Sequence, residues 1–175
     1  CEYCAAGRYQ AAAGQLTCSN CELGRFAASS GSSECLACGV GETQPDSGQN
    51  KCVQCPTGKF KNTIGTDPCT KCVRGTYAPG VRTAACLSCE KGRVQPEEGH
   101  DDCNDCPAGR YQAAAGNVTC IDCEIGRATA SQGSSECLAC GVGETQPDSG
   151  QGACVQCEVG KFKDKAGTAP CTNCS

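Results

Sequence analysis

A pair of cysteines separated by two residues recurs eleven times in this chain, and the pairs follow one another with a constant period of 17. This spacing uses every cysteine of the chain. The first members of the pairs are Cys1, Cys18, Cys35, Cys52, Cys69, Cys86, Cys103, Cys120, Cys137, Cys154 and Cys171. A period this regular is the signature of a repeat array, in which each repeat is one small structural unit. We therefore divide the chain into ten modules, each running from one cysteine pair to the next, followed by an eleventh pair.

The composition excludes an ordinary globular core. Leu, Ile, Val and Phe number 20 among 175 residues, and Trp and Met are absent. So few large apolar side chains cannot offset the backbone entropy lost on folding. The 22 cysteines supply an alternative, because disulfides replace a core in small extracellular scaffolds. We expect a small disulfide-rich repeat protein: an elongated rod or solenoid of short β-hairpin modules with almost no helix and no central hydrophobic core.

Glycine and proline fall at fixed positions, counted from the first cysteine of each module. Position seven is Gly in every complete module, and position fourteen is Gly in all but the fifth, which has Arg82. Such phases indicate a positive φ or the close approach of another segment. Pro45 suits the first central position of a type I turn, and Gly48 suits the left-handed residue that follows it. The pattern predicts one short hairpin per module, from the second cysteine to the next pair.

Positions eight and nine carry basic and aromatic side chains. Position eight is basic in seven modules, which indicates a solvated face or, as an alternative, lateral contacts between rods. Position nine holds six of the seven aromatic residues, which could form a binding stripe or cover the disulfides of neighbouring modules. We favour the second interpretation, because these rings are almost the only large apolar groups available. They are Tyr9, Phe26, Phe60, Tyr77, Tyr111 and Phe162.

A longer period lies on top of the module period. Residues 103–175 repeat residues 1–73 at an offset of 102, with 52 of the 73 positions identical. We therefore expect a single tandem array over residues 1–175, with a six-module unit at 1–102 and a second copy that begins at 103. The chain starts on a cysteine pair and stops just after another, which suggests a longer array. A copied set of six modules suits a fibre in which each module meets a particular neighbour.

Three pairing schemes fit the cysteines. Each pair could close on itself, or neighbouring pairs could interlock as Cys1–Cys18 with Cys4–Cys21. In the third scheme, which we favour, the second cysteine of each pair bonds the first of the next. This scheme closes the base of each predicted hairpin, and each loop contributes about 3 kcal/mol. It gives Cys4–Cys18, Cys21–Cys35, Cys38–Cys52, Cys55–Cys69, Cys72–Cys86, Cys89–Cys103, Cys106–Cys120, Cys123–Cys137, Cys140–Cys154 and Cys157–Cys171, with Cys1 and Cys174 bonded to adjacent repeats.

No catalytic, metal or cofactor site is predicted, and we do not expect an enzyme. Repeated CxxC pairs also occur in zinc sites, but the gap between pairs is short and His100 is the only histidine. A thioredoxin-like role needs one special CxxC in a βαβ setting. The net charge of −4 and the lack of a basic patch argue against nucleic-acid binding. No apolar run in this segment is long enough for membrane insertion.

Disulfides on this scale persist only in an oxidising compartment, so we expect an extracellular or cell-surface location. A glycan could attach at Asn117, which begins an Asn-x-Thr sequon that we place in an exposed strand after a turn. The sequence predicts no other ligand.

Each module follows the pattern C-x-x-C-x-x-G-x-[YF]-x4-G-x3, as in the residues from Cys103 to Tyr111. Over the whole chain this resembles the ephrin-receptor-like cysteine-rich repeats and, more loosely, tumour-necrosis-factor-receptor modules. The resemblance implies an extracellular rod of stacked short-stranded modules. In the receptor modules a cysteine that precedes a CxxC bonds forward to it, at a spacing similar to that of Cys4 and Cys18. The extra cysteines of the tumour-necrosis-factor-receptor modules are absent here.

The strict period and the copied six-module unit lead to a functional expectation. We expect a structural, self-assembling extracellular filament or surface-fibre protein, of the flagellar-hair, surface-fibre or matrix type. The alternative is the stalk of a cell-surface receptor or adhesin. The expected partner is a further copy of the chain in a homopolymer, since a lattice needs the same contacts at fixed intervals.

Overall fold

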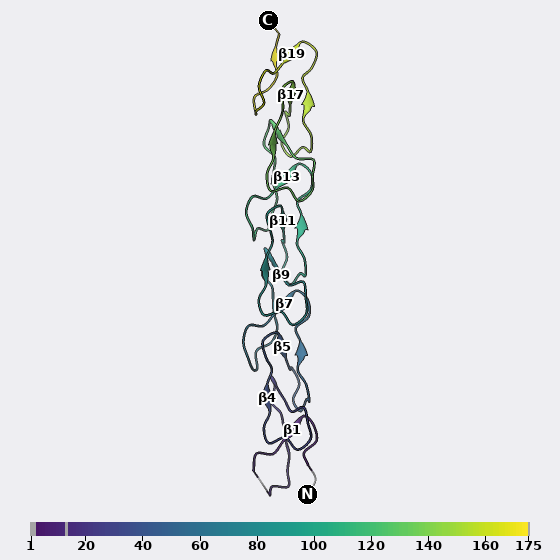
Figure 1. The fold of residues 1–175 in the computed structure, drawn as a ribbon, viewed down its shortest axis with the longest axis vertical. Helices are drawn as coiled ribbons and strands as arrows, with labels where there is room; N and C mark the ends of the chain where they lie inside the picture. The colour runs from purple at the N-terminus through teal and green to yellow at the C-terminus, as the bar shows by residue number, and fades with distance from the viewer. Residues whose placement is uncertain (1–2, 13, 175) are drawn as a thin grey trace. The chain divides into compact units, whose positions relative to one another are not determined.

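A computed structural model describes residues 3–12 and 14–174 as a series of β-hairpins joined by turns (Figure 1). These residues include no helix. The chain divides into two compact units. Unit 1 comprises Cys1–Cys72, Tyr77–Leu87 and Gly99–Asp101, and unit 2 comprises Val73–Thr76, Ser88–Glu98 and Asp102–Ser175. Ten antiparallel two-stranded hairpins, each closed by a disulfide, confirm the predicted class of disulfide-rich hairpin repeat.

Each hairpin pairs positions eight and nine of one module with positions two and three of the next. In unit 1 the pairs are β1 (Arg8–Tyr9) with β2 (Ser19–Asn20), β3 (Arg25–Phe26) with β4 (Leu36–Ala37), β5 (Glu42–Thr43) with β6 (Val53–Gln54), and β7 (Lys59–Phe60) with β8 (Thr70–Lys71). In unit 2 they are β11 (Arg93–Val94) with β12 (Asn104–Asp105), β13 (Arg110–Tyr111) with β14 (Ile121–Asp122), β15 (Arg127–Ala128) with β16 (Leu138–Ala139), β17 (Glu144–Thr145) with β18 (Val155–Gln156), and β19 (Lys161–Phe162) with β20 (Thr172–Asn173). Strands β9 (Thr76–Tyr77) and β10 (Leu87–Ser88) form the tenth pair.

Glycines shape both ends of the hairpins, except in the loop of the fifth module, where Arg82 takes the place of a glycine. The amide of Arg25 donates to the carbonyl of Glu22 at 3.1 Å, and this turn places Gly24 at a φ of 70°. In the loop at the other end, Gly48 has a φ of 72°, as predicted from its place after the Pro45 turn. Among the described residues, Arg82 is the only non-glycine with a positive φ, at 58°. The turn chemistry read from the sequence therefore accounts for the hairpin ends.

Ten disulfides hold the bases of the hairpins, and each joins cysteines 14 residues apart. The second cysteine of each pair bonds the first of the next: Cys4–Cys18, Cys21–Cys35, Cys38–Cys52, Cys55–Cys69, Cys72–Cys86, Cys89–Cys103, Cys106–Cys120, Cys123–Cys137, Cys140–Cys154 and Cys157–Cys171. This is the order of the favoured scheme. Cys1 lies outside the described residues, and Cys174 is exposed with no disulfide partner among them.

The disulfides themselves take the place of a hydrophobic core. In unit 1, Cys21, Ala27 and Cys35 form one buried cluster, and the ring of Tyr9 packs against it. Tyr9 therefore covers the disulfide of the next module, as the second interpretation of the aromatic positions expects. Phe162 departs from that interpretation and is 47% exposed. The next disulfide that its ring would cover involves Cys174, which has no partner among the described residues.

Backbone contacts join most hairpins to the modules that follow them. In unit 1, the amide of Gly24 donates to the carbonyl of Gln44 in the next module at 2.8 Å. A Cβ atom added to Gly58 would lie 1.9 Å from the carbonyl oxygen of Gly99, two modules further on. In unit 2, a Cβ atom on Gly75 would lie 2.0 Å from the carbonyl oxygen of Gly116. Gly58 and Gly75 thus need to be glycine both for the positive φ and for the close approach, whereas a Cβ atom on Gly143 or Gly160 would meet no backbone atom within 4 Å.

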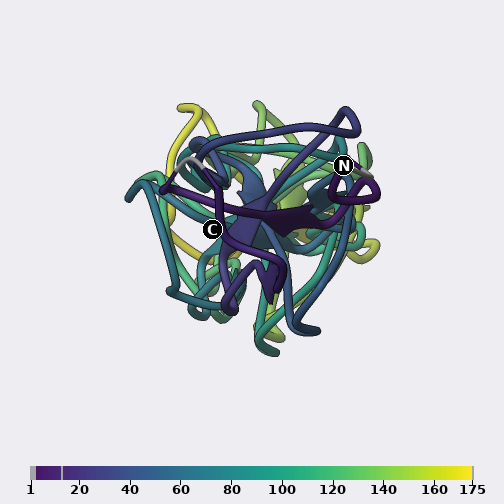
Figure 2. The same cartoon turned by 90° about the horizontal axis from the view of Figure 1, so that it is seen from below.

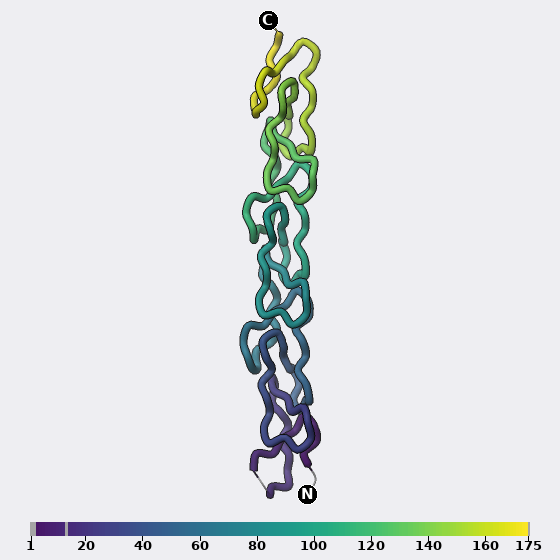
Figure 3. The backbone as a smooth tube through the Cα atoms, viewed as in Figure 1, coloured from purple at the N-terminus to yellow at the C-terminus, as the bar shows by residue number. Residues whose placement is uncertain are grey.

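The arrangement inside unit 1 can be followed in two views. The purple-to-blue tube doubles back once per module, so that successive hairpins lie against one another (Figure 3). In the end view, the purple and blue strand arrows lie inside and the loops lie outside them (Figure 2).

Candidate interaction surface

A glutamine at position ten closes the loop of its own module from inside. The Nε2 atom of Gln44 donates to the carbonyl of Lys51 at 2.7 Å, and its Oε1 atom accepts from the amide of Asp46 at 2.9 Å. Only 4% of the surface of Gln44 is exposed. The same pair of bonds recurs at Gln95, Gln112 and Gln146, all buried. Buried amides satisfied in this way hold the loop in one conformation.

Lysine replaces this glutamine in two modules and forms a different set of bonds. The ammonium group of Lys61 donates to the carbonyls of Glu42 at 2.8 Å and Gly65 at 2.7 Å. Lys163, its counterpart in unit 2, donates to the carbonyls of Glu144 and Gly167. Burial lowers the pKa of Lys61 below the ordinary value of a lysine, although nearby carboxylates oppose this shift. These lysines join the loop of their own module to the preceding module. No role for position ten was predicted from the sequence.

Arginines at position eight bind across their own hairpins. Arg8 donates from Nε to Oδ1 of Asn20 at 2.9 Å, and Arg110 forms an ion pair with Asp122 at 2.5 Å. Both pairs follow the strand register, which places positions eight and three opposite each other. These two exposed side chains therefore bind across their own hairpins on a face that stays in contact with solvent.

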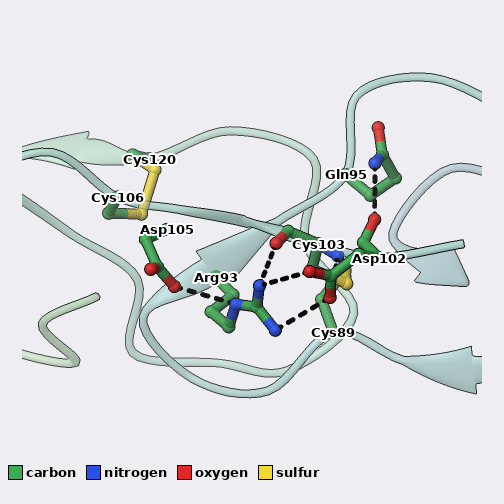
Figure 4. A network of polar contacts seen from close by, with 8 residues as sticks. All are labelled: Cys89, Arg93, Gln95, Asp102, Cys103, Asp105, Cys106 and Cys120. Atoms are coloured by element: carbon green, nitrogen blue, oxygen red, sulfur yellow. Dashed lines mark hydrogen bonds and ion pairs between the residues drawn. A yellow bond between two sulfur atoms is a disulfide. The ribbon is translucent and has the colours of Figure 1, made fainter. Parts of the chain in front are cut away.

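Arg93 has the most elaborate of these networks (Figure 4). Its Nη1 and Nη2 atoms each lie 3.1 Å from one oxygen of Asp102, and its Nε atom lies 2.8 Å from Oδ1 of Asp105. Nη2 also donates to the carbonyl of Cys103. The hydrogen bond from Arg93, together with one from the Cys103 amide, holds the pKa of Asp102 below its ordinary value of 3.8. The paired carboxylates in turn raise the pKa of Arg93.

This network predicts a response to acid. A carboxylate whose pKa is depressed in the folded state contributes stability above its unfolded value of 3.8, and that contribution is lost as the pH falls through the lower folded value. We expect the β11–β12 hairpin to lose amide protection in that acid range, and Asp102 to titrate below 3.8 in a carboxyl NMR titration. The Arg93→Gln variant should raise the pKa of Asp102 toward its ordinary value, and the remaining bond from the Cys103 amide should keep part of the depression. A wild-type Asp102 that already titrates normally would contradict the ion pair.

The surface is unusually rich in aliphatic side chains. Sixteen of the seventeen Leu, Ile and Val residues are exposed, and only Val94 is buried. Six of the exposed residues share position two, on the second strand of a hairpin: Leu36, Val53, Leu87, Ile121, Leu138 and Val155. Five more share position six, in the turn that precedes the first strand: Leu23, Val40, Ile125, Val142 and Val159. The fold therefore presents its aliphatic residues outward at recurring positions.

Two small hollows of about 250 Å³ lie on this surface, one in each unit. The hollow in unit 1 is lined by Tyr9, Glu22, Arg25, Glu34 and Cys35. The hollow in unit 2 is lined by the same residue types 102 positions later: Tyr111, Glu124, Arg127, Glu136 and Cys137. The six-module copy thus preserves a surface feature as well as the fold.

The cysteines offer little to a metal ion. Sulfurs joined in disulfides are not thiolates, which are the form that binds zinc. Within residues 3–12 and 14–174, no three His, Cys, Asp or Glu side chains gather closely enough to hold a metal ion. The described part of the chain also has no helix with the length and apolar character to span a membrane.

Asn117 lies in a loop rather than in the exposed strand that we expected. It is half-buried, and strand β14 begins only at Ile121. Its Nδ2 atom donates to the carbonyl of Ala114 at 3.2 Å, and its own carbonyl accepts from the amide of Gln95 at 3.2 Å. The strands on either side have only two residues each, so the sequon falls in the loop that connects them.

A known family matches the same repeats. The model of a family described as tyrosine-protein kinase ephrin type A/B receptor-like matches residues 1–34, 24–67, 43–83, 58–99, 75–116, 92–140 and 109–150. The chain belongs to this family. The last four matches begin at the same interval as successive cysteine pairs, so the ephrin-receptor-like model follows the module period found in the sequence. No curated protein matches the chain.

Proposed function

We propose that this ephrin-receptor-like array is a structural element outside the cell that associates with further copies of itself into a filament or surface fibre. The observation that carries this proposal is the exposure of sixteen of its seventeen Leu, Ile and Val side chains. Recurring exposed apolar groups favour contact with another surface. Ten disulfides supply a fold that needs none of these side chains for its core.

The proposal assigns the chain no catalytic role and no cofactor. The array would stand in an oxidising environment outside the cell, because disulfides persist there. The 102-residue copy of surface features supports a partner that is itself periodic, since equal contacts at equal intervals are what a homopolymer requires.

A second candidate function is the stalk of a cell-surface receptor or adhesin. The family match favours it, because the family is described by its likeness to ephrin receptors. A stalk needs the disulfide-closed hairpins but does not need contacts between copies. The two candidates therefore differ in whether the array associates with itself.

Sedimentation velocity over a range of concentrations, with electron microscopy of the unreduced protein, tests the proposal. We expect concentration-dependent association into filaments. Replacing Leu36, Val53, Leu138 and Val155 by Thr, the residue that position two already carries in β8 and β20, should weaken this association. Ser19→Thr serves as the control at the same position. A wild-type chain that stays monomeric throughout would favour the stalk.

We also propose that Asn117 carries an N-linked glycan. One hydrogen of its side-chain amide is used by Ala114, and attachment of a sugar leaves one N–H for that bond. We expect secreted protein to lose mass on treatment with an N-glycosidase, and the Asn117→Gln variant to show no such loss. A wild type of unmodified mass from a glycosylating host would contradict the assignment.

A further inference from the structure

We infer that each of the two hollows receives a basic side chain from a second copy of this chain, and that Arg74 supplies it, with Lys91 beside it in the next module. The inference rests on the proposed self-association and names a contact within it. Both hollows have the same lining of one tyrosine, two glutamates, one arginine and one cysteine.

The lining of each hollow suits a cation. In unit 1 the ring of Tyr9 stands beside the exposed carboxylates of Glu22 and Glu34. An aromatic face and carboxylates both attract a guanidinium or ammonium group. The local arginine forms no ion pair with these acids, and Arg25 instead donates from Nη1 to the carbonyl of Cys35 at 3.0 Å. Arg127 does the same with the carbonyl of Cys137 at 2.9 Å in unit 2.

A third set of the same residue types shows what closes such a hollow. Around Arg93 in unit 2, Asp102 stands where Glu34 and Glu136 stand in the two hollows, and it binds the guanidinium in a bidentate pair. Asp105 lies opposite Arg93 in the strand register and forms an ion pair with the Nε atom of Arg93 (Figure 4). At the hollows the residues opposite the arginine are Ala37 and Ala139.

These sequence differences between the hollows and the Arg93 network leave the acids of both hollows without an ion pair. The carboxylates of Glu22, Glu34, Glu124 and Glu136 form no hydrogen bond or ion pair with any residue in the described part of the chain. Two acids and one arginine give each hollow a net charge of −1 at neutral pH. The hollows therefore differ from the Arg93 network in pairing, because both of their acids lack the ion pairs that Asp102 and Asp105 form with Arg93.

The occupant follows from the chain's own basic residues. Position six is apolar, small or hydroxylated in eight modules and basic only at Arg74 and Lys91, both exposed. Arg74 stands three modules after Leu23 and three modules before Ile125. Leu23 and Ile125 follow directly on Glu22 and Glu124, the acids of the two hollows. A shift of half the six-module period between two copies thus brings Arg74 into phase with either hollow.

Two measurements test the contact. The first compares the E22Q/E34Q/E124Q/E136Q variant with the equally charged control D46N/E98Q/D101N/D148N, whose substituted acids are also exposed. By sedimentation velocity at low salt, we expect the hollow variant to associate about tenfold more weakly than the wild type, and the control to match the wild type. Disulfide mapping and amide exchange verify that both variants fold.

The second measurement locates the contact directly. A carbodiimide joins carboxylates to amines in contact, so an R74K variant is mixed in isotopically labelled and unlabelled forms and cross-linked. We expect intermolecular links from residue 74 or Lys91 to Glu22, Glu34, Glu124 or Glu136. Intermolecular links that avoid these four acids would overturn the inference.

The outcomes separate the two proposals. If the wild type associates but the hollow variant associates equally well, the hollow contact is wrong and the fibre proposal stands. If the wild type does not associate at any concentration, the fibre proposal and the hollow contact both fail.

Discussion

The Gly75→Ala variant should lose about 4 kcal/mol or more of the stability of its part of unit 2. The added Cβ atom would lie 2.0 Å from the carbonyl oxygen and 2.7 Å from the carbonyl carbon of Gly116, and both are backbone atoms that cannot rotate away. Relief requires the hairpin of Gly75 to move from the module two further on. That movement would also strain the bond from the Gly75 amide to the carbonyl of Gln95, which is 2.8 Å long.

Gly116→Ala is the matched control, because it changes the other partner of the same contact. Gly116 has a φ of 76° and Gly75 a φ of 78°, so both variants carry the same left-handed strain of about 1 to 2 kcal/mol. A Cβ atom on Gly116, however, would meet only the Ser88 side chain at 3.8 Å. Amide hydrogen exchange of the disulfide-intact protein measures both effects locally. Equal losses in the two variants would show that the close approach adds nothing to the strain.

The second large effect is expected at the buried lysine of unit 1. Lys61→Met keeps the length of the side chain but leaves the carbonyls of Glu42 and Gly65 without their ammonium donor. Each unsatisfied buried group costs about 1 to 3 kcal/mol, so the variant should lose on the order of 2 to 4 kcal/mol. Amide exchange of the loop between β7 and β8 should report the loss, since Gly65 lies there.

Lys61→Gln should be milder. Glutamine is the residue that position ten uses in Gln44, where it bonds the carbonyl at the end of the loop and an amide near its start. A glutamine at residue 61 keeps an NH2 donor that can bond one of the two carbonyls of Glu42 and Gly65, so we expect a loss about half as large as with methionine. If Lys61→Gln destabilises the protein as much as Lys61→Met, the stabilising role belongs to the charge rather than to hydrogen bonding.

The repeat, the hairpins and the order of the disulfides could be predicted because each depends on spacing along the chain. A turn at Pro45 with a left-handed Gly48 fixes one end of a hairpin, and the next cysteine pair fixes the other. The glycines at position seven were also recognised from their fixed spacing. The sequence alone left open whether they are needed for a positive φ or for the close approach of another segment. The structure shows both at Gly58, because its neighbour two modules away approaches on the side where a Cβ atom would stand.

Other features could not be predicted because they depend on side-chain reach across a hairpin. Nothing in the spacing of Arg93 and Arg25 shows that the first binds two aspartates as well as a backbone carbonyl, and the second the carbonyl alone. The difference arises from Asp102, which is one methylene shorter than Glu34, and from Ala37 in place of an aspartate opposite Arg25. Position ten was overlooked for a simpler reason, since Gln and Lys are ordinarily read as surface residues.

The short reach of the disulfides has a consequence for how such a chain is made. Each one joins cysteines 14 residues apart, and the close approaches at position seven join segments that are only two modules apart. A hairpin can therefore be oxidised as soon as its own residues enter an oxidising compartment, and it can be locked once two more modules have followed. The chain can mature in the order of its synthesis, and lengthening the array adds time in proportion but no new kind of pairing error.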